Sequence, residues 1–188
     1  LPQEYVECFK KMSVEAGFPG IYLVANVSDN SIKKEVMLQK GYDAVCYCDI
    51  LGHAQQKRNT FWHKVYKHLQ GILLNRPTHV YDYSKHYKEL IGEIDKDENV
   101  IPQIVPQWDH SPRGGRKTNM YIHSTPEYFA KHVRMAMEAI KGKKEEHQIL
   151  MLKSWNEWAE GNYMEPDMTH GRGYIDALRQ VVDEYKKR

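Results

Sequence analysis

Residues 21–50, IYLVANVSDNSIKKEVMLQKGYDAVCYCDI, decide the fold. Their two ends, 21–27 and 42–50, are apolar runs of the kind found in strands that are buried on both faces. The segment between them, 31–40, predicts a helix that ends at Gly41. Two strands joined through a helix predict a parallel pair, because a parallel connection needs a crossover of a dozen or more residues.

The same alternation of strand and helix continues along the chain. Four parallel strands alternating with helices are predicted in all, whereas a complete eight-stranded barrel needs about 250 residues. We therefore interpret the 188 residues as a single domain of the α/β class, the C-terminal half of a (β/α)8 TIM-like barrel. A complete small α/β sheet is the alternative. The remaining strands are expected at 100–105 and 147–154, and the remaining helices at 2–16, 84–94, 125–141 and 174–187.

Two segments are predicted to be irregular. Residues 51–80 show no sustained pattern beyond a short helix at about 60–69, and residues 106–123 read as a polar, Gly-rich loop. Long insertions between regular elements are often functional loops. Within the second loop, residues 113–117 (RGGRK) could contact a nucleotide diphosphate or an anionic glycan, or could form a solvated loop.

Polar residues follow each predicted strand at its carboxyl end, the edge where α/β sites lie. Each candidate also has a structural alternative. Asp29 could cap the next helix, His53 could be an ordinary loop residue, and Asp109 with Arg113 could form an ion pair that braces its loop. The candidates are Asn26, Asp29, Asp49, His53, residues 107–113 and residues 155–167.

The run SWNEWAEG, residues 154–161, places Glu157 and Glu160 three residues apart. On one helical turn their Cβ atoms would lie about 5–6 Å apart, close to the ~5–5.5 Å between carboxyl groups that act directly on a glycosidic bond. Trp155 and Trp158 offer flat apolar faces on which a sugar ring can stack. The alternative is an ordinary first helical turn, where Glu is favoured by the helix dipole and Trp by burial.

Composition excludes several other classes of function. A net charge of +2 gives no electrostatic reason to expect nucleic acid as a partner. The three cysteines suggest free thiols in a reducing compartment rather than a disulfide framework, and no signal peptide is visible, so we expect a cytoplasmic protein. No membrane span, metal site or cofactor is expected, because the chain has no run of ~20 apolar residues, no zinc-type spacing and no phosphate-binding glycine loop.

Three motifs resemble, in order and spacing, those of the WbsX-type glycosyltransferase family, also called glycoside hydrolase family 99-like domains. They are WNEWAEGNYMEPD at 155–167 followed by GRGY at 171–174, PQWDHSPR at 106–113, and STPE at 124–127. The resemblance covers most of the chain from about residue 81 onward and is most specific in the acidic run.

The resemblance implies half of a (β/α)8 barrel that acts in surface polysaccharide or lipopolysaccharide biosynthesis. It implies that Glu157 is the base that helps the 2-hydroxyl of the sugar attack its own anomeric carbon. Glu160 would be the acid that protonates the leaving oxygen. Ala159 stands where the related endo-α-mannosidases have His, and His110 stands where the family usually has Asn, so transfer and hydrolysis both stay open.

We therefore expect a glycosyltransferase or glycoside hydrolase that acts on an oligosaccharide or a sugar nucleotide. One rival is a non-catalytic glycan-binding domain. Another is an assembly piece that forms a homodimer through its free sheet edges, and a chain without the N-terminal half of the barrel could be inactive. Besides the catalytic pair Glu157 and Glu160, the expected substrate-binding residues are Trp108, Asp109, Arg113, Trp155, Asn156, Trp158 and Glu165.

Overall fold

The computed structural model describes residues 1–48, 65, 69, 79–115 and 118–187. Two candidates from the sequence, Asp49 and His53, lie outside these residues, as does most of the helix expected at 60–69. Arg116 and Lys117 of the basic loop also lie outside them.

The first strand–helix–strand unit forms as predicted, with shorter elements. Helix α1 (Gln3–Glu15) precedes strand β1 (Val24–Val27), and helix α2 (Lys34–Gln39) connects it to strand β2 (Ala44–Tyr47). The two strands are parallel, with Val24 opposite Ala44. Gly17 and Gly41 follow the two helices with φ +88°, the left-handed conformation that commonly ends a helix and favours glycine.

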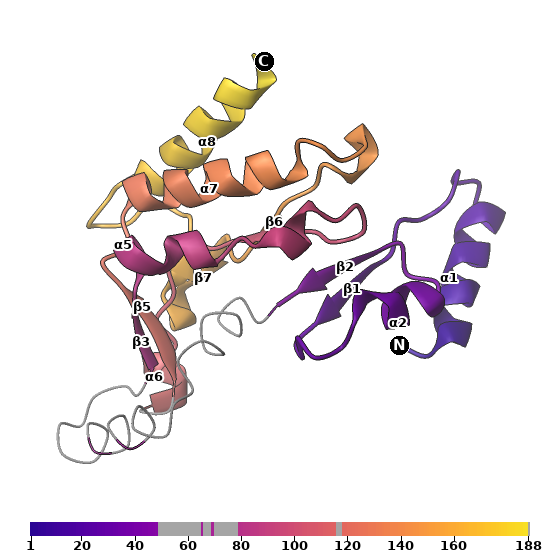
Figure 1. Cartoon of the computed structure of the whole chain (residues 1–188), viewed down its shortest axis with the longest axis horizontal. Helices are drawn as coiled ribbons and strands as arrows, with labels where there is room; N and C mark the ends of the chain where they lie inside the picture. The colour runs from indigo at the N-terminus through magenta and orange to yellow at the C-terminus, as the bar shows by residue number, and fades with distance from the viewer. Residues whose placement is uncertain (49–64, 66–68, 70–78, 116–117, 188) are drawn as a thin grey trace.

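The four strands expected from the sequence follow one another in parallel. A parallel bridge joins Val45 of β2 to Val100, just before strand β4 (Gln103–Ile104), and β4 pairs in parallel with strand β6 (Met151–Leu152). Helix α7 (Pro126–Ile140) connects these last two strands, and helix α8 (Gly173–Lys186) follows them. Figure 1 shows α7 and α8 side by side on one side of β6.

Two further strands lie where irregular chain was expected, and this part of the prediction was wrong. Strand β3 (His79–Asp82) pairs in parallel with strand β5 (Asn119–Ile122). Tyr81 and Tyr121 are opposite each other and buried. Each strand has only four residues, which is too short for a period of two to stand out from loop sequence.

The single helix expected at 84–94 was also wrong. The segment forms helix α5 (Tyr83–His86), followed by the 3-10 turns η1 (Tyr87–Glu89) and η2 (Glu93–Lys96). The carboxylate of Asp82 accepts a hydrogen bond from Ser84 N and caps α5. Gly92 is extended and interrupts the helical path.

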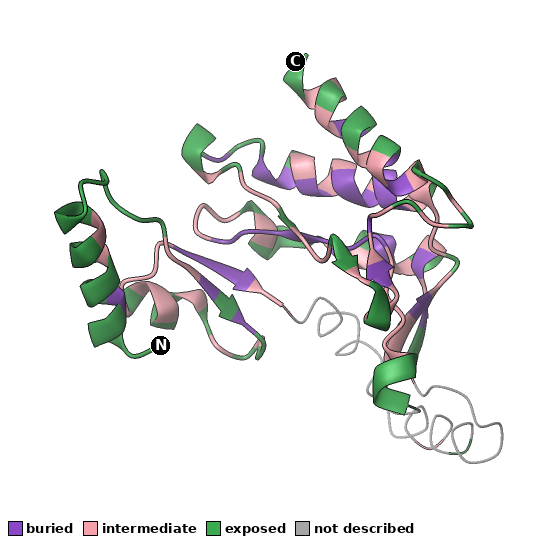
Figure 2. Cartoon of the chain, turned by 180° about the vertical axis from the view of Figure 1, so that it is seen from behind, coloured by how far each residue is buried: buried purple, intermediate pink, exposed green. Residues whose placement is uncertain are grey.

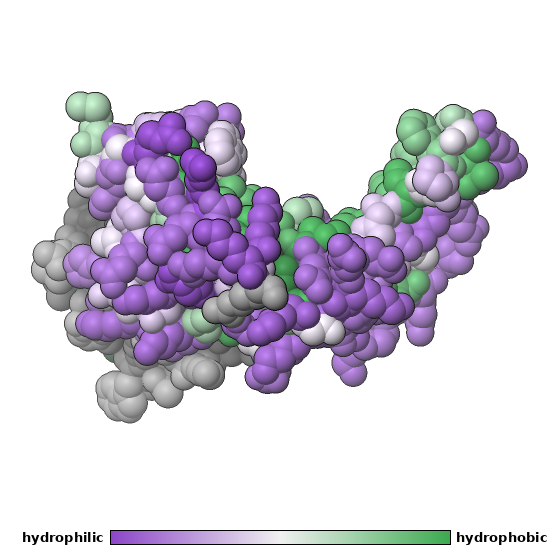
Figure 3. Space-filling view, turned by 90° about the horizontal axis from the view of Figure 1, so that it is seen from above, coloured by the Kyte–Doolittle hydropathy of each residue, from purple (hydrophilic) through white to green (hydrophobic). Residues whose placement is uncertain are grey.

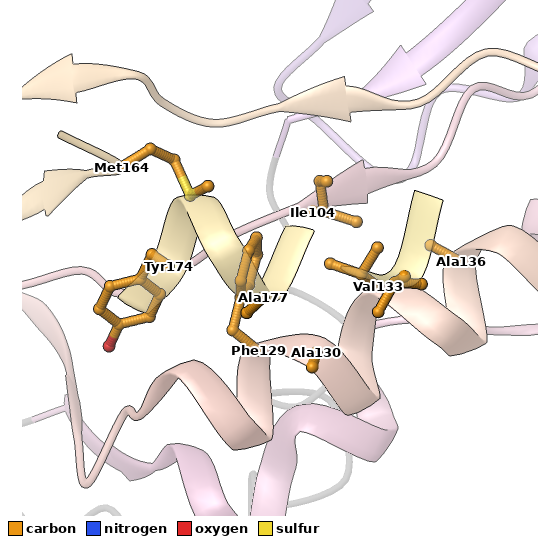
Figure 4. Packing of buried hydrophobic residues seen from close by; sticks show 9 residues of the cluster. Ile104, Phe129, Ala130, Val133, Ala136, Met164, Tyr174 and Ala177 are labelled. Carbon is orange, nitrogen blue, oxygen red and sulfur yellow. The ribbon is translucent and has the colours of Figure 1, made fainter. Parts of the chain in front are cut away.

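Helices α7 and α8 form the largest part of the core. Thr125 caps α7 by accepting a hydrogen bond from Tyr128 N, and Pro126 occupies its first turn, as predicted. Small side chains let the two helices approach closely, and the buried faces meet over β4 (Figures 2 and 4). The buried cluster consists of Ile104, Phe129, Ala130, Val133, Ala136, Met164, Tyr174, Ala177 and Val181.

Apolar side chains remain exposed on α1 and the segment after it. Tyr5, Phe9 and Met12 are each about half exposed along one side of the helix, and Phe18 follows at its end. Apolar surface gathers at this end of the molecule in Figure 3. Among the described residues, no helix combines the length and apolar character needed to cross a bilayer.

A buried polar network connects α5 to α7. The hydroxyl of Tyr83 donates to the carbonyl of Val105 at 2.6 Å and lies 2.9 Å from Nδ1 of His132. Since the Tyr83 proton is directed to Val105, Nδ1–H of His132 donates to the Tyr83 oxygen. Burial lowers the pKa of His132 from its ordinary value of 6.5 to about 4, so the imidazole is neutral in the folded protein at neutral pH.

We expect His132 to make the free energy of unfolding depend on pH. Because the unfolded chain takes up this proton below pH ~6.5 and the folded chain only near 4, stability falls as pH drops from about 6.5 to 4, by up to about 3 kcal/mol. Urea unfolding across that range should show this dependence of the free energy of unfolding on pH, and His132→Gln should remove it. His123→Gln, at an exposed histidine, should keep the pH dependence. Loss of the pH dependence in both variants would contradict its assignment to His132.

Candidate functional site

The acidic motif forms a hairpin, so the predicted helical turn was wrong. Strand β7 (Asn156–Glu157) runs antiparallel to strand β8 (Asn162–Tyr163), and the 3-10 turn η5 (Trp158–Glu160) connects them. Gly161 closes the turn with φ +52°, a backbone conformation that glycine adopts without strain. A spacing of three residues is compatible with this tight turn as well as with a helix, so the sequence could not distinguish them.

The hairpin nevertheless brings both glutamates to one cation. Nη1 of Arg113 lies 3.0 Å from Oε1 of Glu160 and 3.9 Å from Oε1 of Glu157. These distances limit the separation of the two carboxylate oxygens to about 7 Å. His110 also contacts Glu160, with Nε2 3.3 Å from Oε1. The side chain of Glu160 is only 18% exposed, whereas that of Glu157 is 43% exposed.

Arg113 reaches the glutamates because its loop is built on β5. The chain before it runs antiparallel to β5, through a bridge between Asp109 and Met120 and a hydrogen bond from Tyr121 N to Trp108 O. Helix α6 (Ser111–Gly114) then carries Arg113 towards the hairpin. Asp109 N donates to Glu160 O at 2.8 Å and joins the loop to η5.

Asp109 and Arg113 are not joined by the bracing ion pair considered from the sequence. The Asp109 carboxylate accepts a hydrogen bond from Ser111 N at 2.9 Å and so shapes the first turn of α6. Arg113 pairs with the two glutamates instead. The ion pair forms between residues 47 positions apart, a relation that no local spacing reveals.

Asn162 is a structural residue of the site that the sequence reasoning missed. It is buried, and its side-chain amide donates to the carbonyls of Gln107 and Lys153. Ser154 Oγ donates to the carbonyl of Asn162 at 2.7 Å. One amide therefore connects the third-strand loop, the end of β6 and the hairpin. The only signal in the sequence was an amide directly after the turn glycine.

Substituting Gly161 tests how closely the hairpin and the Asp109 loop pack. A Cβ at this position would lie 3.1 Å from Asp109 Cβ and 3.2 Å from Asp109 N, so Gly161→Ala adds a steric conflict to the backbone strain. Gly171→Ala is the matched control, with φ +54° and no atom within 4 Å. We expect about 2–3 kcal/mol of destabilisation for the first and about 1 kcal/mol for the second, measured by urea unfolding. Equal losses of stability in the two variants would show that the close approach of Gly161 to Asp109 does not affect the free energy of unfolding.

Two exposed indoles lie on the same hairpin as the glutamates. Trp158 stacks on Tyr163 with ring centroids 3.7 Å apart, and its Nε1 donates to Glu165 at 2.6 Å. Trp155 is about half exposed, as is Trp158. Glu165 thus fixes the orientation of an indole, which makes it a support for the aromatic surface.

The other expected binding residues lie around this hairpin. Asn156 is exposed on β7, opposite Tyr163. Trp108 lies beside His110, and the Lys153 ammonium is 4.4 Å from the centroid of the Trp108 ring. Trp108, Asn156, Trp158 and Glu165 thus lie on the two adjoining loops that also carry Arg113 and the acidic pair.

The candidates after the first strand lie on separate elements. Asn26 is exposed within β1. Asp29 accepts a hydrogen bond from Ser31 N, and bonds from the side chain and backbone of Ser31 lower the pKa of its carboxyl. Helix α2 begins later, at Lys34, so Asp29 shapes a turn and is not its cap. No cluster of three or more potential metal ligands occurs within the described ranges.

Parallel strands that alternate with helices, together with the likeness to a solved structure, indicate a TIM-barrel-related α/β fold. A solved structure described as a glycoside hydrolase-like protein matches with a TM-score of 0.52 and 15% sequence identity, covering 94% of this chain and 49% of that one. A second is the GH99 endo-alpha-mannosidase from Bacteriodes thetaiotaomicron in complex with BIS-TRIS-propane. Its TM-score is 0.48 at 14% identity, covering 88% of this chain and 47% of that one.

The family follows from the sequence comparison. The model of the family described as Glycosyltransferase WbsX matches residues 1–178, and the chain belongs to this family. Two curated relatives are uncharacterized WxcX proteins of Xanthomonas campestris pv. campestris. They are 29% identical over 104 residues (strain B100) and 32% over 101 residues (strain ATCC 33913). The matches cover 55% and 51% of this chain, but only 15% and 14% of the relatives.

Proposed function

We propose that the protein is a carbohydrate-active enzyme that cleaves or transfers glycosyl units during surface polysaccharide or lipopolysaccharide synthesis. Membership of the WbsX family supports the class of function. The observation that carries the proposal is the gathering of Glu157 and Glu160 around Arg113, on a hairpin that also exposes two indoles. Its substrate would be an oligosaccharide or a sugar nucleotide, handled in the cytoplasm.

The geometry supports different roles for the two acids, a base and a proton donor. Glu157 is the more exposed carboxylate and has only the longer contact to Arg113, so it can approach a substrate hydroxyl as a base. Glu160 is more enclosed and can deliver a proton to the leaving oxygen. A separation of at most about 7 Å allows the ~5–5.5 Å of retaining pairs as well as the short end of the ~6.5–9.5 Å of inverting pairs.

The remaining residues would bind the sugar. Trp155 and Trp158 present half-exposed ring surfaces of the kind on which pyranose rings stack. Arg113 is 59% exposed beyond its contacts to the glutamates and can donate to hydroxyl or phosphate oxygens. We assign supporting roles in the same site to Trp108, Asp109, Asn156 and Glu165.

We also propose that the parallel strands β1, β2, β4 and β6 belong to the C-terminal half of a larger barrel. Among the described residues, the outer edges of β1 and β6 have no strand partner, and α1 leaves apolar side chains exposed. A parallel strand and helix would cover both features. Hydrogen exchange in the full-length protein should show protected amides at both edges; fast exchange at both would contradict the proposal.

An oligosaccharide panel tests the function directly. The full-length protein is incubated with mannose, glucose and rhamnose oligosaccharides, with and without sugar-nucleotide donors, and products are identified by mass spectrometry. Cleaved or extended product supports an enzyme. Binding in calorimetry with no product from any combination would instead favour the rival glycan-binding domain, which needs the indoles but not the acids.

A further inference from the structure

Lys153 lies on the face of the sheet opposite helices α7 and α8. It directly follows β6, and its amide donates to the carbonyl of Ile104, which continues the parallel pairing with β4. Ile104 and Leu152 belong to the other face, where they pack in the cluster between the helices. Because neighbouring side chains of a strand point to opposite faces, Lys153 shares its face with Gln103 and Met151, which are paired in register. In a β/α barrel this face is the interior, and its residues at the carboxyl ends of the strands line the site.

Three contacts place Lys153 beside the candidate site. Its ammonium lies 4.4 Å from the ring centroid of Trp108, on the loop that carries Arg113. Its carbonyl accepts a hydrogen bond from the buried amide of Asn162 in the hairpin. On the sheet side, burial raises the pKa of the Cys46 thiol to about 11, and the nearby charge of Lys153 opposes this rise. Lys153 therefore lies between the inner face of the sheet and the two loops that carry the acids.

The charge of Lys153 is not balanced by a carboxylate in the part of the chain that the structure describes. Within those ranges its ammonium has the contact with Trp108 but no ion pair and no hydrogen-bond acceptor. Arg113, in contrast, contacts both Glu157 and Glu160. Lys153 is also partly buried, so part of its hydration is already lost and a ligand of opposite charge would gain a strong partner.

We propose that Lys153 selects a saccharide that carries a carboxylate, as a uronic acid does, an inference that rests on the hairpin being the saccharide site of the proposed function. A single ammonium matches the single charge of a carboxylate, whereas the diphosphate of a sugar nucleotide brings two. Glu157 and Glu160 would repel such a group. The carboxylate therefore binds at Lys153, beside Trp108, and leaves the glycosidic bond to the acids.

Matched saccharides test this charge preference without any turnover. The full-length protein is titrated by calorimetry with glucuronate, mannuronate and galacturonate oligosaccharides and with their glucose, mannose and galactose counterparts. In about 50 mM salt, at least one uronate should bind about tenfold or more tightly than its neutral counterpart. Salt of about 0.5 M should weaken this preference, because the charges are only partly buried. Equal affinities within every pair, or no binding of any saccharide, would overturn the inference.

Three variants assign the preference to this lysine. Lys153→Met keeps an apolar side chain beside Trp108 but removes the charge, so the preference for the uronate should disappear while affinity for the neutral saccharide changes by a few fold at most. Lys153→Arg should retain the preference. Lys88→Met is the matched control, because the Lys88 ammonium also lies over a ring, 5.9 Å from the centroid of Tyr87, but on η1. A preference that survives in Lys153→Met, or that is lost equally in Lys88→Met, would overturn the inference.

The same measurements separate this inference from the proposed function. Product formed from neutral saccharides, without a preference for uronates in binding, overturns the role of Lys153 and keeps the enzyme. Uronate binding that depends on Lys153, without product from any saccharide or donor, overturns the enzyme and keeps the inference. Loss of affinity for UDP-glucose in Lys153→Met, with uronate affinity unchanged, overturns the assignment to a carboxylate. The comparison of matched saccharides needs no variant, so it decides the inference even if Lys153→Met does not fold.

Discussion

Replacing either acid by its amide, Glu157→Gln or Glu160→Gln, is expected to lower turnover by about 10²–10⁴-fold, the range typical of general acid–base groups. An amide keeps the size of the side chain and much of its hydrogen bonding, but it neither accepts nor releases the required proton. The measurement is kcat and kcat/KM in the full-length protein on the oligosaccharide that gives product.

Glu165→Gln is the matched control for these two variants. Its carboxylate accepts from Trp158 Nε1, and a glutamine oxygen can accept the same bond. We expect a change in turnover of a few fold at most, mainly in KM. Normal turnover in both Glu157→Gln and Glu160→Gln would eliminate the assignment, and unchanged sugar affinity with no activity in any form would favour the glycan-binding rival.

Truncation of Phe129 is expected to be the most destabilising core change. The ring is fully buried between α7 and α8 and meets Tyr174 edge to face at 5.7 Å (Figure 4). Phe129→Ala removes this contact and leaves a cavity in a cluster already lined by small residues, so we expect a loss of about 3–5 kcal/mol in the free energy of unfolding. Urea unfolding monitored by circular dichroism measures it.

Phe9→Ala provides the comparison for the same chemical change. Phe9 is 46% exposed on α1, so its truncation should cost about 1 kcal/mol or less in this chain. A loss at Phe129 as small as that at Phe9 would mean that the packing of α7 on α8 contributes little to stability.

The sequence predicted those elements whose signals are long or chemically explicit. The apolar runs gave β1 and β2, and Thr125 with Pro126 located the start of α7. It failed where an element is short or depends on a distant partner. Strands β3 and β5 are stabilised by each other, 40 positions apart, and neither four-residue segment differs locally from a loop.

In the candidate site, too, some features could be predicted from local sequence and others could not. The types and positions of the acids and indoles could be read from the motif, because their chemistry follows from the residue type. The partner of Arg113 and the role of Asn162 could not, since both depend on contacts between separate loops. The helical turn predicted for the acidic run was wrong because Gly161 adopts a left-handed conformation that allows the chain to turn back as a hairpin.

The buried amide of Asn162 has a thermodynamic consequence. Because it fastens the hairpin to two other segments, the backbone around the acids loses its freedom when the protein folds and not when a glycan arrives. Association with a saccharide then carries a smaller entropic penalty. Calorimetric entropies of glycan association in Asn162→Ala would reveal how much preorganisation this one side chain supplies.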